Sequence, residues 1–343
     1  MNPEVIEVSD ERVLSKTPKV SILMITYNHA DYLAEAIEGV VKQSCDFPFE
    51  LIIGEDASSD ATRRIALEYQ KRFPEIIRVI YSENNVGMNI NSKRIFEKAR
   101  GEYIAYCEGD DFWIDTEKLK KQVAIIKQNP QIGIVHSNWT KARLEKSYWN
   151  YDTKRSVHRH TPEKYLSGDL FKTWHHPKIL RTCTILLRKC TMDSWYKSGL
   201  MDPKYHFGDS VLSAYVTSKW QVGYTPCVTA VYRVSPNSVL RSGTNARVAF
   251  YRSSLQFDTA ARVFFSEHTP AYTQHYRWDS AASLLLWGAR AGDFEAVKEA
   301  FLDFKKHFTL SSFVSTGVST IAMRLPSYTP PQRSRAKSTG QRQ

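Results

Sequence analysis

Residues 102–113 read Glu-Tyr-Ile-Ala-Tyr-Cys-Glu-Gly-Asp-Asp-Phe-Trp, and this stretch decides the fold. Its first half, Tyr103–Cys107, is a short apolar run typical of a strand buried on both faces of a parallel sheet. Three carboxylates follow, at Glu108, Asp110 and Asp111. Clustered carboxylates at the end of a buried strand are unfavourable unless a cation or a donor-rich ligand binds there, and oxygen ligands suit Mg²⁺ or Mn²⁺. The alternative is an acidic loop that caps the next helix.

Apolar strands and amphipathic helices alternate before this stretch. Strands are predicted over Lys19–Thr26, Phe49–Ile53 and Ile76–Tyr81, with a helix after each. This alternation predicts a parallel sheet with helices on both faces, and such sheets bind ligands at the carboxyl ends of their strands. Polar loops follow the first two strands and Tyr103–Cys107, so all three fall on that edge. Their convergence favours a binding site over a capping loop.

The second half of the chain is less regular. A strand is predicted at Ile132–Trp139, and residues 141–178 show weak periodicity. Later helices are predicted at about 246–266, 274–291, 293–307 and 308–325, followed by a disordered basic tail. An apolar helical stripe joined to a basic tail fits docking on an anionic membrane, and it equally fits a helix packed on its own domain.

Composition limits the class of protein. The net charge of +11 indicates anionic partners, but no nucleic-acid-binding signature accompanies it. The five cysteines include no C-x-x-C pair and lie in apolar segments, as reduced cysteines of a cytoplasmic protein do. No signal peptide or spanning helix is predicted. We therefore expect a cytoplasmic protein, with peripheral contact to the inner face of the membrane left open.

Three motifs resemble those of family 2 glycosyltransferases. Val20–Asn28, with its Thr-Tyr-Asn ending, resembles the family's first strand. Glu55–Thr62 resembles the Asp-Asp-Gly-Ser-x-Asp segment that holds the nucleobase, and Glu108-Gly109-Asp110 resembles the Asp-x-Asp motif. The resemblance, from about Lys19 to Val239, implies the inverting GT-A fold. This is an α/β nucleotide-diphospho-sugar transferase fold, a Rossmann-like mixed sheet flanked by helices, here with a C-terminal helical extension.

That resemblance also implies a division of the chain. We expect a flexible arm over 1–18 and a GT-A domain over 19–240. Within the domain, residues 19–128 would bind the nucleotide-sugar and residues 129–240 the acceptor. A helical region over 241–325 and a disordered basic tail over 326–343 would complete the chain.

The resemblance assigns site residues. Asp110 would bind the divalent metal, Mg²⁺ or Mn²⁺, and Glu108 the ribose or a metal-bound water. Glu108 departs from the family's aspartate and is longer by one methylene. Asp209, where an apolar helix opens, would be the catalytic base, with an N-cap role as the alternative. The other donor-binding residues that the resemblance implies are Thr26, Tyr27, Glu55, Asp56, Asn85, Gly87, Lys93 and Asp111.

The implied function is a metal-dependent inverting glycosyltransferase. It would move a sugar from a nucleotide-diphosphate donor, a UDP-sugar, to a saccharide or lipid-linked acceptor in surface polysaccharide biosynthesis. Two alternatives stay open: a non-catalytic nucleotide-sugar-binding protein and a nucleotidyltransferase. The second would need a glycine-rich, basic phosphate loop near the N-terminus, and Thr26-Tyr27-Asn28-His29 does not supply one.

Overall fold

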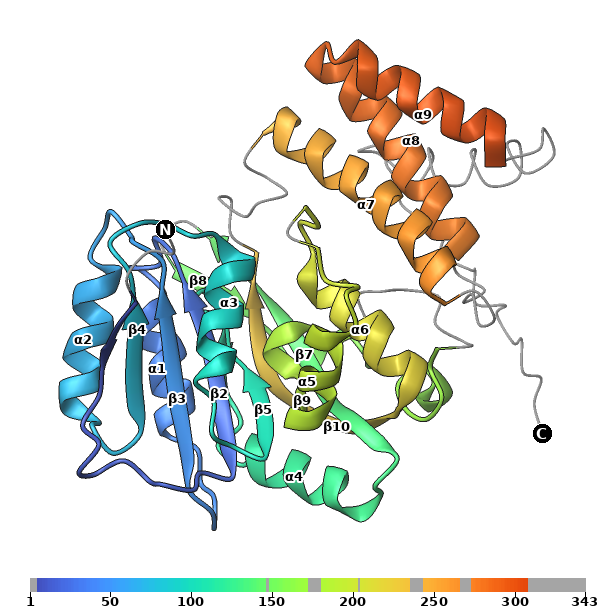
Figure 1. Ribbon diagram of the computed structural model, residues 1–343. Coiled ribbons are helices and arrows are strands. Elements are labelled where there is room, and N and C mark those ends of the chain that lie inside the picture. The colour runs from blue at the N-terminus through green and yellow to red at the C-terminus, as the bar shows by residue number, and fades with distance from the viewer. Residues whose placement is uncertain are drawn as a thin grey trace, which may run out of the picture.

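The computed structural model describes residues 5–145, 148–171, 180–202, 204–234, 243–265 and 273–307. In this part of the chain one ten-stranded sheet forms the centre of the molecule (Figure 1). Its strands are β1 (Ile6–Val8), β2 (Val20–Thr26), β3 (Phe49–Glu55), β4 (Ile77–Tyr81), β5 (Tyr103–Tyr106), β6 (Phe112–Trp113), β7 (Ile132–Glu145), β8 (Tyr148–Tyr151), β9 (Leu186–Arg188) and β10 (Gln221–Arg233).

The sheet is mixed. Its strand order is β1-β4-β3-β2-β5-β9-β7-β10-β6, and β8 pairs with β7 off this path. β2 pairs in parallel with β3 and β5, and β3 pairs in parallel with β4. β9 then runs antiparallel between β5 and β7, whereas β10 is parallel to β7. The carboxyl ends of β2 to β5 therefore meet at one edge, as the alternation of strands and helices predicts.

Helices cover both faces of this sheet and form a separate group after it. The helices are α1 (Leu33–Val41), α2 (Thr62–Arg72), α3 (Met88–Glu97), α4 (Lys118–Gln128), α5 (Lys189–Lys197), α6 (Gly208–Lys219), α7 (Thr244–Phe264), α8 (Thr273–Ala291) and α9 (Phe294–His307). Three 3₁₀ turns lie at Thr153–Arg155, Glu163–Tyr165 and Thr182–Thr184.

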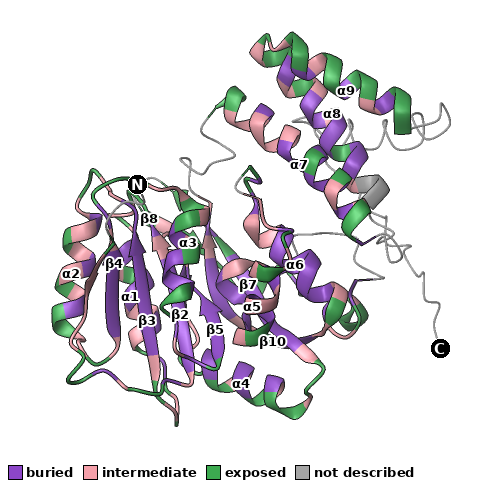
Figure 2. Ribbon diagram, viewed as in Figure 1, coloured by how far each residue is buried: buried purple, intermediate pink, exposed green. Residues whose placement is uncertain are grey.

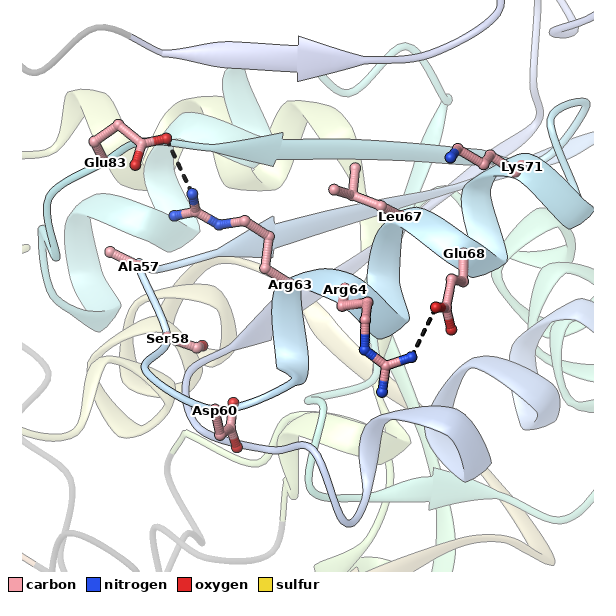
Figure 3. A pocket seen from close by; sticks show the side chains of 9 residues that line it. All are labelled: Ala57, Ser58, Asp60, Arg63, Arg64, Leu67, Glu68, Lys71 and Glu83. Carbon is pink, nitrogen blue, oxygen red and sulfur yellow. Dashed lines mark hydrogen bonds and ion pairs between the residues drawn. The ribbon is translucent and has the colours of Figure 1, made fainter.

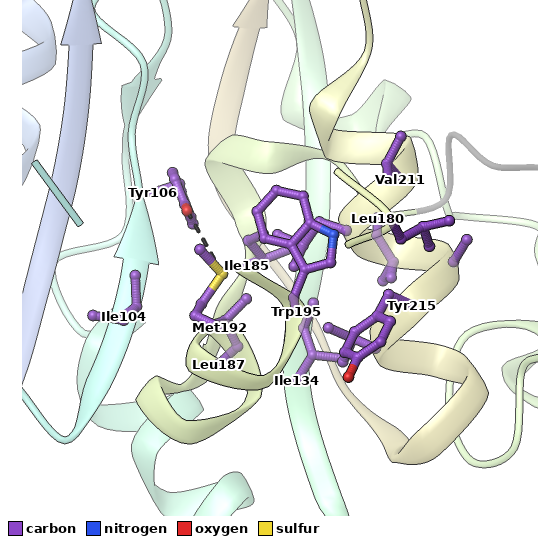
Figure 4. Close-up of a cluster of buried hydrophobic side chains, with 14 of the residues drawn as sticks. Ile104, Tyr106, Ile134, Leu180, Ile185, Leu187, Met192, Trp195, Val211 and Tyr215 are labelled. Atoms are coloured by element: carbon purple, nitrogen blue, oxygen red, sulfur yellow. Dashed lines mark hydrogen bonds between the residues drawn. The ribbon is translucent and has the colours of Figure 1, made fainter. Parts of the chain in front are cut away.

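Two apolar cores follow from the alternation of side chains along the strands. Ile22 and Ile53 point to one face, where α1, α2 and α4 pack on the sheet. Leu23 and Ile52, their neighbours in sequence, point to the other face and pack with α3, α5 and α6. Figure 4 shows part of this second core, where Met192 and Trp195 lie among side chains from the sheet and α6. The central strands are buried on both faces (Figure 2), which explains why they are almost wholly apolar.

The structure corrects several predicted boundaries. The arm over 1–18 is not loose throughout, because Ile6–Val8 adds an antiparallel edge strand to β4. A buried arginine fixes it, since Arg78 Nε donates to Glu7 Oε1 at 2.8 Å. β7 runs on to Glu145 and forms a hairpin with β8, in a region expected to lack structure. In β10, Pro226 falls in the register irregularity between Thr225 and Val228, the position that proline tolerates in a sheet.

The helical region begins at α7. α8 packs against both α7 and α9 around Trp278, Ala281 and Leu284. α7 also joins this region to the sheet domain, because Phe257 and Ala261 pack in the second core with α6. No helix among the described residues is both long and apolar enough to cross a bilayer. The helix expected over 308–325, the tail over 326–343 and the boundary expected near residue 240 lie outside the described residues.

Candidate functional site

The end of β2 anchors the two acidic loops that the sequence singled out. The Thr26 carbonyl accepts the backbone N–H of Asp56 at 3.1 Å, and the neighbouring carbonyl of Ile25 accepts the N–H of Gly109 at 3.0 Å. The loops after β3 and β5 are thus held on either side of one strand end. The structure brings the predicted nucleobase segment and the predicted metal loop to the same edge of the sheet.

Gly109 makes a close approach that explains the glycine between the carboxylates. A Cβ on this residue would lie 2.8 Å from Thr26 Oγ1 and 2.9 Å from His29 Nδ1. Any larger residue would push the loop away from β2. Thr26 Oγ1, His29 Nδ1 and Glu108 Oε2 are buried polar atoms without a hydrogen-bond partner among the described residues. Buried polar atoms are normally paired, so these three mark a place where a ligand completes the bonding.

The acidic loop is electrostatically strained. Burial, together with the negative charges of Asp110 and Asp209, raises the pKa of Glu108 to about 7. Burial also raises the pKa of Asp111 well above its usual value, with Asp110 and Glu108 adding to the effect. Such carboxyl groups gain most from a nearby cation. Asp111, however, is only 2% exposed and accepts the backbone N–H of Arg233, so it lies beneath the loop rather than on its open side.

Arg233 is the internal cation of this loop, and sequence reasoning missed its position. Its side chain is 1% exposed, and Nη1 donates to the Asp110 carbonyl at 2.9 Å. Nη2 pairs with Glu35 of α1, and the guanidinium lies 4.3 Å from the ring of Phe112. Arg233 thus ties the end of β10 to the acidic loop and to α1.

Asp56 organises the loop that follows β4. Its Oδ1 accepts the N–H of Val86 at 2.8 Å, and its Oδ2 accepts the N–H of Gly87 at 2.9 Å. Asn85 donates to the Asp56 carbonyl at 2.9 Å, and Gly87 has a φ of 83°, which glycine adopts without strain. Tyr27 stands at the rim of the same edge and is 47% exposed. Asp56, Asn85 and Gly87 therefore form one connected unit.

Three predicted donor-binding residues need correction. Glu55 is fully buried, and its oxygens accept Ser58 N–H and Arg63 Nε, each at 2.6 Å. Lys93 is exposed on α3 and pairs with Glu97. Asp111 is covered, as described above. The resemblance implied that these three side chains contact the donor. In the structure, Glu55 and Asp111 support the loops instead, and Lys93 faces solvent.

Arginines complete the support of the β3 loop. Arg63 bridges Glu55 and Glu83, and it donates to the Ser82 carbonyl at 2.9 Å. Arg94, which is 8% exposed, pairs with the Glu55 carbonyl and donates to Ser82 Oγ at 2.8 Å. These contacts fix the ends of β3 and β4 relative to each other. Neither arginine carries a recognisable sequence motif.

Asp209 lies in the first turn of α6. It is partly exposed, and the N-cap of this helix is Phe207, so the N-cap role is wrong. Its Oδ1 accepts the N–H of the next residue, Ser210, at 2.7 Å. The start of α6 lies beside the start of α3, since a Cβ on Gly208 would be 3.3 Å from Asn89 Oδ1. The negative charge of Asp209 contributes to the raised pKa of Glu108, so Asp209 lies within electrostatic range of the acidic loop.

The oxygen atoms available in the acidic loop suit a hard divalent cation whose remaining coordination positions are filled by a bound ligand. Glu108 and Asp110 offer carboxylate oxygens, and Glu108 Oε2 has no partner in the described part of the chain. No cluster of three or more His, Cys, Asp or Glu side chains is preformed to hold a metal in the described ranges. Mg²⁺ and Mn²⁺ commonly bind through one or two carboxylates plus substrate phosphates. The residues present therefore fit such a site.

A surface cavity lies on the outer side of the Asp56 loop, beside α2 (Figure 3). It has a volume of about 630 Å³ and is lined by Ala57, Ser58, Asp60, Arg63, Arg64, Leu67, Glu68, Lys71 and Glu83. Arg63 and Arg64 are already paired with Glu83 and Glu68. Neither Asp110 nor Asp209 contributes to its lining. The cavity therefore adjoins the Asp56 loop but is separate from Asp110 and Asp209.

Comparison with known proteins identifies a family. The profile of Glycosyl transferase family 2 matches residues 21–194. An uncharacterized protein of Mycobacterium tuberculosis is 46% identical over 115 residues, which are 34% of this chain and 33% of that protein. The putative teichuronic acid biosynthesis glycosyltransferase TuaG of Bacillus subtilis is 36% identical over 111 residues, 32% of this chain and 43% of that protein. These matches thus span less than half of each relative's length.

A solved structure supports the fold over most of the chain. The mannosyltransferase PcManGT from Pyrobaculum calidifontis, solved in complex with GDP-Man and Mn²⁺, superposes with a TM-score of 0.55. The comparison covers 91% of this chain and 82% of that one, at 15% sequence identity. At this identity the likeness concerns the fold alone. It confirms a mixed α/β sheet flanked by helices with further helices at the C-terminus.

Proposed function

Because the family profile covers half of its residues, the chain belongs to glycosyl transferase family 2, and we propose that it is a metal-dependent, inverting glycosyltransferase. The proposed donor is a nucleotide-diphosphate sugar, a UDP-sugar, and the acceptor a saccharide or a lipid-linked saccharide. The observation that carries the proposal is that the Asp56 loop and the Glu108–Asp110 loop are both held at the end of β2, where Thr26 Oγ1 and Glu108 Oε2 are buried without a partner among the described residues. TuaG, named for teichuronic acid biosynthesis, supports a role in surface polysaccharide assembly.

The donor would lie along the carboxyl edge of the sheet. Thr26, Tyr27 and Asp56 would bind the base and ribose, and the Asn85–Gly87 loop would lie beside them. Asp110 would hold Mg²⁺ or Mn²⁺ at the diphosphate, and Glu108 would bind the ribose or a metal-bound water. The bound cation would neutralise charge on the departing phosphate oxygen. PcManGT holds a sugar nucleotide and Mn²⁺, which supports this arrangement.

Asp209 would act as the general base on the opposite side of the sugar. It would take the proton of the acceptor hydroxyl while that oxygen bonds to the anomeric carbon and the bond to the diphosphate breaks. The nucleoside diphosphate leaves, and the configuration at the anomeric carbon inverts. Its position in the first turn of α6, with no cap role, leaves one carboxylate oxygen available for this task.

The test is donor turnover with Mn²⁺ or Mg²⁺. Incubation with UDP-sugars should release nucleoside diphosphate. Release of pyrophosphate would instead favour a nucleotidyltransferase. Metal-dependent donor binding without turnover would favour a non-catalytic binding protein. Asp110→Asn should abolish metal-dependent turnover, and Asp209→Asn should lower kcat about 10²–10⁴-fold while donor affinity changes little. Unchanged metal dependence in Asp110→Asn, or lost donor binding in Asp209→Asn, would reject the assigned role.

The predicted membrane contact is part of the same proposal. A lipid-linked acceptor would be presented at a bilayer surface, and the segments expected to reach it, residues 308–325 and the basic tail, lie outside the described residues. The cytoplasmic location predicted from the sequence belongs to this proposal as well. A fractionation experiment that separates soluble from membrane-bound protein would test both.

A further inference from the structure

The outward face of α9 carries large apolar side chains. Phe294, Phe301 and Leu302 are 83%, 65% and 53% exposed, respectively. Lys298 and Lys305 are exposed between them. These five positions recur at i, i+4, i+7, i+8 and i+11, so they form one continuous surface along the helix. We call this surface the α9 stripe.

The α9 stripe is not needed to hold the helix in place. The opposite side of α9 presents Ala296, Ala300 and Phe304, which are buried against α7 and α8. Figure 2 shows this division, with the outer side of α9 exposed and its inner side buried. The inner side of α9 therefore packs against α7 and α8, and the outer side carries a second apolar surface that is exposed. An exposed apolar surface of this kind marks an interaction site.

The charge around the α9 stripe is positive. Lys306 lies beside Lys305, and both are exposed. Of the three acidic residues of α9, Glu299 pairs with Arg252 of α7 and Asp303 with Arg277 of α8, whereas Glu295 is exposed in the first turn. The surface thus offers apolar and cationic groups together.

The mixture of phenylalanine and lysine in the α9 stripe indicates which kind of partner binds it. The core of a protein–protein interface is depleted in lysine, yet Lys298 and Lys305 lie within the α9 stripe. At a bilayer the same arrangement is favourable, because aromatic rings enter the headgroup region while lysines extend to anionic phosphates. We propose that the α9 stripe docks on an anionic lipid bilayer. A second copy of the chain is the competing occupant.

This inference rests on the proposed function only in its choice of partner, because a lipid-linked acceptor requires the enzyme at a membrane. Vesicle binding needs neither donor nor turnover. Asp110→Asn should therefore bind vesicles like the wild type, and variants of the α9 stripe should keep their turnover of soluble donor. Failure of one proposal is thus distinguishable from failure of the other.

The experiment is sedimentation of the full chain with vesicles. Phosphatidylcholine mixed with phosphatidylglycerol is compared with phosphatidylcholine alone. Phe294→Ser combined with Phe301→Ser should weaken partitioning at least about tenfold. Lys298→Gln combined with Lys305→Gln should weaken it about fivefold per lysine on the anionic vesicles. Matched controls are Val263→Ser, an apolar side chain 76% exposed on α7, and Lys71→Gln on α2, both expected to bind normally.

The outcomes separate cleanly. Loss of vesicle binding in both stripe variants, with unchanged thermal unfolding and normal controls, supports the proposal. A wild type that stays in solution with anionic vesicles overturns it, as does a stripe variant that binds fully. A concentration-dependent dimer in sedimentation velocity that disappears in Phe294→Ser/Phe301→Ser also overturns it, because the stripe would then contact a second copy.

Discussion

A buried pair of histidines gives the fold a stability that depends on pH. His136 on β7 and His158 are 0% and 6% exposed, and their rings lie 5.5 Å apart in an edge-to-face arrangement. Tyr224 of β10 packs on both rings. The Nε2 of His136 bonds to the Leu166 carbonyl at 2.6 Å, and the Nδ1 atoms of both histidines are buried without a partner among the described residues. Protonating either ring would therefore bury a positive charge without an acceptor for the Nδ1 proton.

Burial lowers the pKa of both histidines. The pKa of His136 falls from 6.5 to about 3, where the neighbouring His158 adds to the effect, and the pKa of His158 falls from 6.5 to about 4. Between the unfolded pKa of 6.5 and the native pKa values, these histidines are therefore protonated in the unfolded chain and neutral in the native chain. Stability is present above pH ~6.5 and is lost as the pH falls toward the native pKa values. Each histidine should contribute a loss of about 2 kcal/mol between pH 7 and pH 5.

We therefore expect His158→Phe to remove about 2 kcal/mol of the stability lost between pH 7 and pH 5. Phenylalanine keeps the ring and does not titrate. Urea unfolding of wild type and variant at both pH values measures the difference, and comparing the two proteins cancels the titration of all other groups. His160→Asn is the matched control, because His160 is exposed two residues away. Equal pH dependence in His158→Phe and wild type would refute the assignment.

Three further predictions concern the site. Gly109→Ala should lower metal-dependent turnover at least about tenfold, because its Cβ would displace Thr26 from the acidic loop; unchanged turnover would show that the loop tolerates the shift. Arg233→Met should lower the free energy of unfolding by about 2 kcal/mol, measured in urea, because it removes the hydrogen bond of the guanidinium to the Asp110 carbonyl and its pairing with Glu35. Asp56→Ala should raise the donor Kd in calorimetry and release the loop that Gly87 anchors, and full donor affinity would argue against it.

The sequence predicted the fold well where the signal is local. Strands with apolar residues on both faces, such as Val20–Thr26, can only be central strands of a covered sheet. The last helices were also close to the observed α7, α8 and α9, because their apolar period of 3.6 residues is read within each segment. The three loops at the carboxyl edge were predicted to meet because the strand directions alone require it.

The errors lie where distant segments decide the outcome. Ile6–Val8 looked like part of a polar arm, and only its pairing with β4 and the Glu7–Arg78 contact make it a strand. Arg233 contacts Asp110 across 123 residues of sequence, and no periodicity announces such a contact. Side-chain roles at a motif depend in the same way on partners supplied by other elements.

Bonding separates the supporting residues of this motif from those that would meet a ligand. Glu55 is a supporting residue, because its carboxylate is fully buried and bound to Arg63 and to the Ser58 amide. Thr26 Oγ1, His29 Nδ1 and Glu108 Oε2 instead lack a partner within the described part of the chain. Folded proteins rarely bury polar atoms unpaired, so these atoms are completed by what binds. The chemistry therefore belongs between the end of β2 and Glu108, and His29, which no motif assigned, borders it.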